Sequence, residues 1–415
     1  MRNIAILAPK SAQNLYTLAT IKTLCKSAGV CEVPEPEADA LWVSLCDPDD
    51  IGTLWQARKL AKGRPVIMGG FEAWYGVPYL AWADAIIVGE GQEFIDAWGK
   101  NGPDVALSLP CVLTMDRYKQ GDPVIPSYQV PYSSVPLLRL PGKERYYFLA
   151  GRGCKGKCSF CATSWTQPHT QCPDKIIKRV VRYVEDRGGK LNLISNDSES
   201  VERSPSVNAQ SVRVVDYLKS PERYKSSMLH FGIEFWDGRS RALNGKPIKD
   251  SDICDVLRVT KEQKQKCEFF FIVGYPGWSM NSVRDFADSV IAPTVDRSPE
   301  IHIKCTYLDP CPHTPLSDTP VSPEWCDIKG VFAELNSRNK RIRVFPTRSA
   351  GRSAWRTVLH RCTPEEAVIL PPEPKDTNKA ESFGRFKEQL SAVGMEYLLH
   401  GSRKLNEQAI KTRIK

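Results

Sequence analysis

Over the first 100 residues, short apolar runs alternate with stretches of helical spacing, and this alternation limits the fold more than any other feature. A strand that is apolar throughout is typical of a parallel sheet, whose strands are buried on both faces. Strands that alternate with helices predict a doubly wound, Rossmann-like domain. We expect strands at 3–8, 30–33, 40–45, 65–68 and 83–88, and helices at 13–28 and 51–61.

Glycine turns follow two of these expected strands. Gly69-Gly70 ends the fourth run, and Gly89-Glu90-Gly91 ends the fifth. Open α/β sheets bind ligands beyond the carboxyl ends of their strands. The sequence therefore predicts a ligand site at these two turns, within a domain of residues 1–100.

A second series of βα units covers residues 146–320. We expect its strands at 146–150, 191–195, 229–234, 268–273 and 301–307, and its helices at 175–187, 250–265 and 282–291. Units of this length predict a partial (β/α)6 barrel of the TIM type, with functional residues at the carboxyl ends of the strands. We interpret the proline-rich residues 101–145 as a linker, and residues 321–415 as a small, basic C-terminal extension.

The composition is that of an ordinary globular protein, with 41% hydrophobic and 25% charged residues among 415. No apolar run reaches the ~18 residues of a membrane span, and the first one is too short for a secretion signal. We therefore expect a cytoplasmic protein that does not bind membranes. Most of its 14 cysteines are scattered and are expected to be buried free thiols.

Three cysteines form the one cluster, Cys154, Cys158 and Cys161, directly after an expected strand. Thiolates at these spacings can hold three irons of a cubane and leave the fourth iron open to chelation. Gly153 and Gly156 allow the loop to fold tightly. The alternative is structural zinc, which needs a fourth ligand such as His169 or Cys172.

This Cys-x3-Cys-x2-Cys spacing, with Phe160 before the last cysteine, resembles the signature of the radical S-adenosylmethionine (SAM) superfamily. The resemblance implies a [4Fe–4S] cluster whose open iron binds SAM. It also implies one-electron cleavage of SAM to methionine and a 5′-deoxyadenosyl radical that abstracts hydrogen. A reductant of the flavodoxin or ferredoxin type is implied as well.

Four downstream segments resemble SAM-site motifs of the same superfamily. His313 stands where the last of these motifs has glycine, and Phe235 stands where the second has serine. The resemblance implies contacts to SAM from Glu234 and from further residues that we take as cofactor-binding: Phe160, Asn196, Asp197, Lys246, Gly274, Pro276 and Gly277.

The N-terminal domain resembles the cobalamin-binding-type domain of one radical SAM subgroup. The matching segments are 43–48, 65–70 and 83–91. The first histidine of the chain is His169, so the domain itself supplies no axial histidine to cobalt. Two interpretations stay open: a domain that binds cobalamin, and a retained scaffold that covers the barrel mouth.

A basic segment accounts for most of the net charge of +9. It could form a nucleic-acid interface, a solvated helix face, or a patch for an acidic redox partner. It contains no acidic residue, and its basic residues are Arg338, Lys340, Arg341, Arg343, Arg348, Arg352, Arg356 and Arg361.

Three functions follow as hypotheses. The first is a radical SAM isomerase that rearranges or modifies a nucleic-acid base or nucleotide, as proposed for hypermodified thymidines in phage DNA. The second is a cobalamin-dependent methyltransferase for a small molecule or peptide, and the third is a non-catalytic iron–sulfur protein. Four further residues are interpreted either as pocket residues or as packed ones: Trp236, Tyr275, His302 and His313.

Overall fold

The structure is a computed structural model. It describes residues 3–9, 12–139, 144–195, 212–224, 227–296, 299–321, 328–346, 350–374, 380–401 and 405–411. The sequence-based predictions for Asn196, Asp197 and Arg348 lie outside these residues. Within the described part of the chain, no helix is both long and apolar enough to cross a membrane.

The N-terminal domain is built on a six-stranded sheet of order β2-β1-β3-β4-β5-β6. All pairs are parallel except β5–β6, which is antiparallel. The strands are β1 (Asn3–Leu7), β2 (Cys31–Glu32), β3 (Ala40–Ser44), β4 (Val66–Gly69), β5 (Ala85–Ile87) and β6 (Val112–Thr114). Every residue of β3 is buried, as the apolar run predicts.

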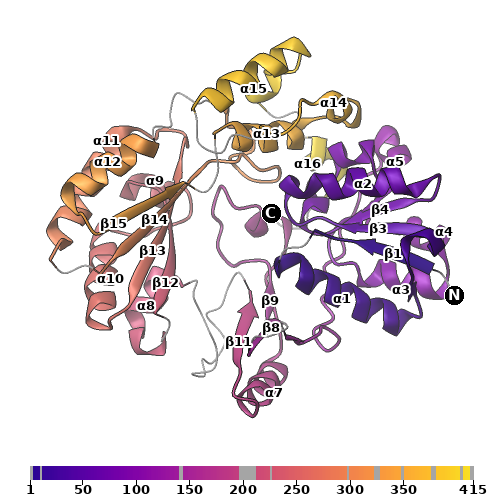
Figure 1. Cartoon of the computed structure of the whole chain (residues 1–415), viewed down its shortest axis with the longest axis horizontal. Coiled ribbons are helices and arrows are strands. Elements are labelled where there is room, and N and C mark those ends of the chain that lie inside the picture. The colour runs from indigo at the N-terminus through magenta and orange to yellow at the C-terminus, as the bar shows by residue number, and fades with distance from the viewer. Residues whose placement is uncertain are drawn as a thin grey trace.

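Helices cover both faces of this sheet, as expected for a doubly wound domain (Figure 1). One face packs against α1 (Ala12–Ala28), α3 (Gln92–Lys100) and α4 (Pro103–Leu107), and the other against α2 (Ile51–Ala61). The expected linker at 101–145 is instead structured at its start. It holds α4, the edge strand β6 and α5 (Met115–Gln120), because the apolar residues of 106–113 complete the core.

The second series of βα units forms two sheets. One has the order β11-β8-β7, and the other is the parallel sheet β12-β13-β14-β15. Its strands are β7 (Leu138–Arg139), β8 (Arg145–Leu149), β11 (Lys190–Ile194), β12 (Met228–Glu234), β13 (Lys266–Val273), β14 (Ile301–Tyr307) and β15 (Ile342–Pro346). Six of these strands, all but β7, pair in parallel in chain order, as in a partial (β/α)6 barrel. The described residues include no pairing between β11 and β12.

Helices connect successive strands of these sheets. They are α7 (Asp174–Glu185), α8 (Val214–Lys219), α9 (Gly238–Leu243), α10 (Asp250–Glu262), α11 (Met280–Phe286) and α12 (Ile328–Arg338). A hairpin of β9 (Gly151–Arg152) and β10 (Thr170–Gln171) frames the cysteine loop and its short helix α6 (Thr163–Thr166). Since β15 pairs with β14, the barrel continues beyond residue 320, where we had placed its end.

The C-terminal residues are not a detached extension. The helices α13 (Ala350–Arg361), α14 (Pro364–Ile369), α15 (Ala380–Ala392) and α16 (Leu405–Ala409) share a hydrophobic cluster with β3, β4 and α2. In Figure 1, α13 lies between the N-terminal domain and the four-stranded sheet. This position brings α13 to the edge of the candidate site.

Candidate functional site

The cysteine loop lies directly after β8 and β9, at the carboxyl end of the first barrel strand. The Gly156 amide donates a hydrogen bond to Cys154 Sγ at 3.3 Å. A Cβ added at Gly156 would lie 3.4 Å from Cys154 Sγ and 3.7 Å from Cys158 Sγ, so both sulfurs flank this glycine. Burial, with the charges of Cys161 and Cys154, raises the pKa of the Cys158 thiol to about 11.

The turn after α9 holds this loop in place. The Ser159 amide donates to the Asn244 carbonyl at 3.2 Å, and Cys158 Sγ lies 3.7 Å from the Gly245 carbonyl. A side chain at Gly245, whose φ is +76°, would meet the Lys157 carbonyl at 2.6 Å. Only glycine allows this approach of the two backbones.

Glu234 and Lys246, predicted from the two ends of one downstream segment, lie together beside the loop. Lys246 Nζ is 3.4 Å from Glu234 Oε1 and donates to the Gly232 carbonyl at 2.9 Å. The register of β12 shifts here, and Glu234 has a φ of +70°. Burial raises the pKa of the Glu234 carboxyl, and Lys246 lowers it. A strained, largely buried carboxylate at a strand end is typical of a functional site.

The turn after β13 contains the other predicted SAM contacts that the structure describes. Gly274 and Gly277 both have positive φ, at +74° and +84°, and Pro276 lies between them. Phe160 of the cysteine loop packs against Phe235, with ring centroids 5.5 Å apart. The structure thus places the predicted cluster and SAM residues at the same ends of neighbouring elements.

Three aromatic and histidine side chains are packed rather than open to a ligand. Trp236 is buried and stacks on Phe271 with centroids 4.0 Å apart. Tyr275 is buried, and its hydroxyl accepts a hydrogen bond from the Trp236 amide at 3.2 Å. His302 pairs with Glu300 at 3.0 Å.

His313 keeps the turn that glycine makes in the related motif. Its φ is +65°, in the left-handed region that glycine adopts most readily. One of its ring nitrogens, Nε2, lies 3.0 Å from the Trp74 carbonyl of the N-terminal domain. His313 therefore connects the end of β14 to the first domain.

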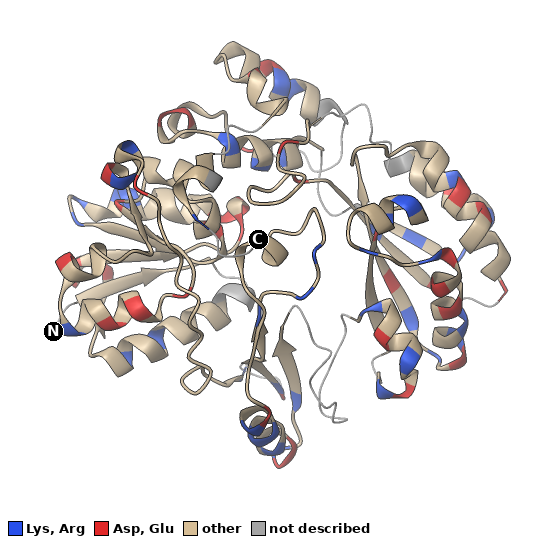
Figure 2. Cartoon of the chain, turned by 180° about the vertical axis from the view of Figure 1, so that it is seen from behind, with Lys and Arg blue, Asp and Glu red and all other residues tan. Residues whose placement is uncertain are grey.

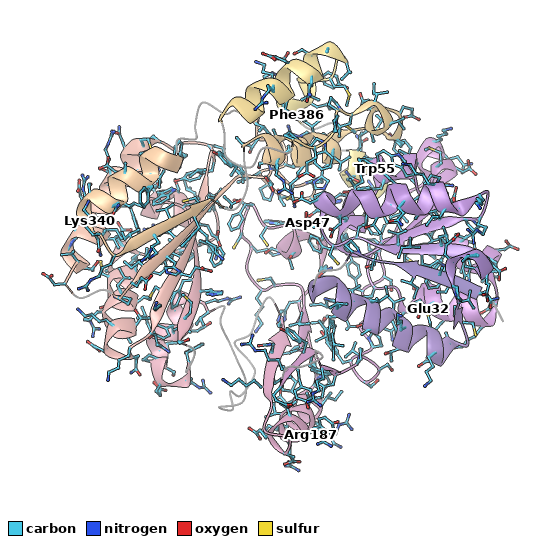
Figure 3. All side chains as sticks on the ribbon, in the orientation of Figure 1. Glu32, Asp47, Trp55, Arg187, Lys340 and Phe386 are labelled. Atoms are coloured by element: carbon cyan, nitrogen blue, oxygen red, sulfur yellow. The ribbon has the colours of Figure 1, made fainter. Side chains whose placement is uncertain are left out.

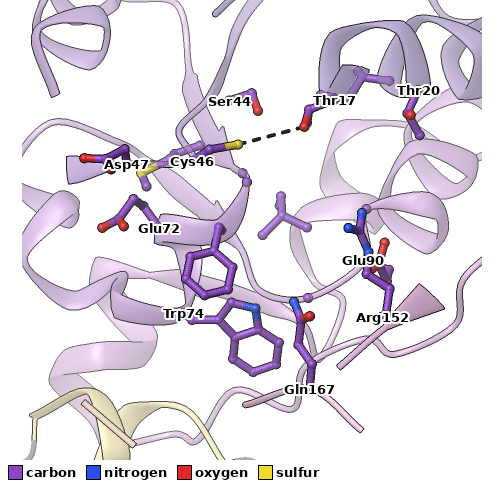
Figure 4. A pocket seen from close by; sticks show the side chains of 18 of the residues that line it. Thr17, Thr20, Ser44, Cys46, Asp47, Glu72, Trp74, Glu90, Arg152 and Gln167 are labelled. Atoms are coloured by element: carbon purple, nitrogen blue, oxygen red, sulfur yellow. Dashed lines mark hydrogen bonds and ion pairs between the residues drawn. The ribbon is translucent and has the colours of Figure 1, made fainter. Parts of the chain in front are cut away.

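A cavity of about 730 Å³ lies between the N-terminal domain and the cysteine-loop side of the barrel. It opens at the carboxyl ends of β3, β4 and β5, where the glycine turns predict a ligand site. Figure 4 shows Ser44, Cys46 and Asp47 around it with Trp74, Arg152 and Gln167. The end of β14 contributes Cys311 to its wall, and α13 contributes His360.

The buried polar atoms of this cavity that have no hydrogen-bond partner among the described residues include Trp42 Nε1 and Ser44 Oγ, in residues that are 7% and 0% exposed. Buried polar groups are nearly always satisfied. Gly69 also has open space where a Cβ would be, while one at Gly70 would meet the Leu45 carbonyl at 2.2 Å. A large apolar cavity with unsatisfied polar atoms fits a large, partly polar ligand such as a corrinoid.

Ionisable groups line the rest of the wall. Glu72 is buried and bonds both the Tyr79 hydroxyl, at 2.7 Å, and His360 Nε2, at 2.9 Å. Arg152 of β9 pairs with Glu90 of the second glycine turn at 2.9 Å. Sequence reasoning missed Glu72 and His360, because each stands alone in the sequence and only the fold brings them together.

The basic segment does not form one surface. Arg352 pairs with Asp49 at 2.6 Å. Arg356 contacts Asp47 at 2.5 Å, Asp49 at 3.0 Å and Asp309 at 3.2 Å. Burial alone would lower the pKa of Arg356, but these three carboxylates raise it. Arg352 and Arg356 therefore form ion pairs within the molecule, and contact between them and nucleic acid stays a prediction.

The remaining basic residues of the segment lie on the four-stranded sheet and its helix. Arg338 pairs with Asp288 at 3.0 Å, and Arg343 with Glu300 at 3.0 Å. Lys340 and Arg341 are exposed between α12 and β15. Figure 3 shows Lys340 at the outer side of this sheet, far from Asp47 at the inner edge of the first one. Figure 2 shows acidic residues interspersed with basic ones over all parts of the chain.

The three cysteines of the loop could hold three irons of a cubane, or three of the four positions of a zinc site. No three His, Cys, Asp or Glu side chains of the described residues are close enough to hold one metal ion. A cubane holds its cysteine sulfurs farther apart than a single ion does. Cys172, one candidate fourth ligand for zinc, is instead buried with Tyr146, Phe148 and Ile177 in a hydrophobic cluster.

Comparisons with known proteins bear on the fold. No protein-family model and no curated protein matches the chain. Among the solved structures that match are two of the cobalamin-dependent S-adenosylmethionine radical enzyme OxsB. The structure with aqua-cobalamin bound matches with a TM-score of 0.52 at 11% identity over 72% of this chain and 53% of that one.

The second structure contains aqua-cobalamin and S-adenosylmethionine, and it matches with a TM-score of 0.51 at 11% identity over 72% of this chain and 52% of that one. This chain therefore spans about half the length of those structures. The likeness shows a mixed α/β fold with parallel sheets, similar to that of a cobalamin-dependent radical SAM enzyme.

Proposed function

Because the chain has the fold of a cobalamin-dependent radical SAM enzyme, we propose that it is a radical SAM enzyme that also binds a corrinoid. One observation carries the proposal: the loop of Cys154, Cys158 and Cys161 packs against the turn that places Lys246 beside Glu234. Residues from two motifs far apart in the sequence lie side by side, and this proximity supports a shared site for the cluster and SAM.

Each part of the site has its own role. The three cysteines would hold a [4Fe–4S] cluster, and Glu234 and Lys246 would bind the charged and hydroxyl groups of SAM. When the cluster and SAM are both bound, the cluster would supply the one electron that cleaves SAM to methionine and a 5′-deoxyadenosyl radical. Lys155 and Lys157 are exposed on the loop and would attract an acidic reductant of the flavodoxin or ferredoxin type.

The cavity supports the corrinoid part of the proposal. Its volume of about 730 Å³ and the unsatisfied Ser44 hydroxyl and Trp42 indole fit a ligand with an apolar ring and polar side groups. The Tyr75 hydroxyl adds a third polar atom to the cavity wall. Gly69 leaves open space where a side chain would otherwise lie. With a corrinoid there, methyl transfer to a small molecule or peptide becomes the favoured reaction.

A nucleic-acid base stays the second candidate substrate. It is supported by the exposed residues Lys340, Arg341 and Arg343, after Arg352 and Arg356 are accounted for by internal ion pairs. Binding of a DNA duplex that weakens steeply with salt, and weakens further in R341A/R343A, would support this substrate. A DNA affinity that does not change between low and moderate salt would contradict a nucleic-acid substrate.

The proposal is tested by anaerobic reconstitution with iron, sulfide and hydroxocobalamin, followed by desalting. We expect the visible spectrum to show both an iron–sulfur cluster and a retained corrinoid. A protein that holds the cluster but no corrinoid would still be compatible with radical SAM chemistry, but it would contradict cobalamin-dependent methyl transfer. S-Adenosylhomocysteine formed with SAM and dithionite would favour methyl transfer over rearrangement.

A further inference from the structure

His360 lies on α13, where this helix packs against the N-terminal domain. Its side chain is 5% exposed and forms part of the cavity wall. Among the residues that the structure describes, it is the one histidine that lines this cavity. The backbone is held as well, because Asn406 Nδ2 donates a hydrogen bond to the His360 carbonyl at 3.0 Å. The imidazole is therefore fixed at the edge of the candidate corrinoid site.

A buried carboxylate holds one nitrogen of this ring. His360 Nε2 lies 2.9 Å from Glu72 Oε2, and the same oxygen accepts a hydrogen bond from the Tyr79 hydroxyl at 2.7 Å. Glu72 is 3% exposed and lies in the short helix that follows β4. The Tyr75 ring packs against the imidazole, with ring centroids 4.4 Å apart. Since these contacts fix the ring and occupy Nε2, Nδ1 is the ring nitrogen that remains for a ligand.

A carboxylate paired with one imidazole nitrogen is the usual surrounding of a histidine that binds a metal. Such a histidine almost always donates its other ring N–H to a carboxylate or a carbonyl, which fixes the tautomer and makes the ligating nitrogen more basic. Acidic groups elsewhere in the wall are already paired. Asp47 and Asp309 bind Arg356, and Glu90 binds Arg152.

One histidine suits a metal that is already held by a macrocycle. Among the described residues, no three His, Cys, Asp or Glu side chains are close enough to hold a free metal ion. The ring of a corrinoid supplies four nitrogens to its cobalt, so a single protein nitrogen is enough to fill an axial position. The cavity beside His360 has a volume of about 730 Å³.

Resting on the proposed function, we propose that His360 is an axial ligand to the cobalt of the corrinoid, and that Glu72 is its positioning residue. Nε2 carries the proton that it donates to Glu72, and the unprotonated Nδ1 replaces the water, hydroxide or base that occupies this position in the free corrinoid. The ligand comes from α13, because residues 1–100 contain no histidine. The C-terminal helices thereby complete a site that the N-terminal domain begins.

The test is EPR spectroscopy of the full chain loaded with hydroxocobalamin, desalted and reduced to Co(II), without SAM. Spectra are recorded at liquid-nitrogen temperature, where the signal of a reduced [4Fe–4S] cluster is broadened. One axial nitrogen splits the cobalt lines into triplets when it is nitrogen-14 and into doublets when it is nitrogen-15. We therefore expect triplets from unlabelled protein and doublets from protein whose histidines carry nitrogen-15.

The labelled wild-type protein decides the assignment on its own. Triplets that persist after labelling would come from the base of the corrinoid itself, and they would overturn the assignment, as would retained corrinoid whose cobalt lines show no nitrogen splitting. Protein that retains no corrinoid after desalting would instead contradict the corrinoid part of the proposed function, and the assignment with it.

Variants separate the ligand from its surroundings. His360→Gln keeps an amide that can donate to Glu72, and we expect it to lose the doublets. His302→Gln on β14, where His302 pairs with Glu300 at 3.0 Å, is the matched control and should keep them. In Glu72→Gln we expect the affinity of His360 for cobalt to fall by roughly tenfold or more, and the doublets with it. Doublets that persist in H360Q would overturn the assignment.

Discussion

At the residue scale, the cysteine triad gives the most direct prediction. Cys158→Ser removes one of three thiolates, so we expect iron bound after reconstitution to fall by roughly half or more, because cluster affinity depends on the complete set. Iron and sulfide analysis with the absorbance near the cluster bands measures this. Cys254→Ser on α10 is the matched control, and equal losses in both variants would contradict the assignment.

Lys246 gives a prediction that depends on pH. In Lys246→Met, the buried Glu234 loses the charge that lowers its pKa, so its pKa rises further. A carboxyl whose pKa is raised in the folded state lowers the stability of the protein when it is ionised, and this cost disappears when it is protonated. We therefore expect the loss of Tm in K246M to be larger at pH 7 than at about pH 5, and SAM affinity to fall roughly tenfold. A Tm difference that does not change with pH would argue against a shared site for the two residues.

At the element scale, the turn after β4 offers a matched pair of glycines. A methyl group at Gly70 meets the Leu45 carbonyl at 2.2 Å and a φ of +98°, whereas Gly69 has open space. We expect Gly70→Ala to lose about 2 kcal/mol or more of unfolding free energy. Gly69→Ala should keep near-normal stability but retain less corrinoid, because its methyl group enters the cavity. Urea unfolding and the corrinoid spectrum separate the two effects, and normal corrinoid retention in both folded variants would contradict the site.

Elements with strong local signals could be predicted from the sequence. The apolar runs of β1, β3 and β4 and the period of α2 predict their elements within a residue or two. The expected linker was wrong at its start, since β6 has only three residues and its apolar character is short. Its place at the sheet edge depends on the tertiary packing of 106–113, which no local pattern reveals.

The residues of the candidate site likewise fall into those that the sequence reveals and those that only the fold reveals. The cysteines, Glu234 and Lys246 lie in motifs, so their types and spacing could be recognised. His360, Glu72 and Cys311 could not, because they lie on elements that only the folded chain brings to one cavity. The ion pairs of the basic segment with the N-terminal domain could not be predicted for a related reason: Asp47 and Asp49, which pair with Arg352 and Arg356, lie 303 to 309 positions away in the sequence.

At the scale of the whole molecule, Arg356 joins the three parts of the chain. In Arg356→Met, the carboxylates of Asp47, Asp49 and Asp309 remain without their shared cation. Breaking a buried pair in this way typically costs about 3–5 kcal/mol. Arg343→Met removes an exposed pair with Glu300 and should cost less than about 1 kcal/mol.

Thermal unfolding and limited proteolysis of α13 measure this difference. We expect R356M to unfold at a lower temperature and to expose cleavage sites near α13, and R343M to resemble the wild type. Similar behaviour of both variants would show that Arg356 does not hold the parts together.

The proposed function depends on the cleavage of SAM by the cluster-loaded protein. The most direct measurement is 5′-deoxyadenosine formed from SAM and dithionite under anaerobic conditions, in protein whose iron and corrinoid contents are known. We expect more 5′-deoxyadenosine than the Cys158→Ser variant forms, from protein that retains corrinoid after desalting. Protein with a complete cluster that forms no more 5′-deoxyadenosine than that variant would contradict it.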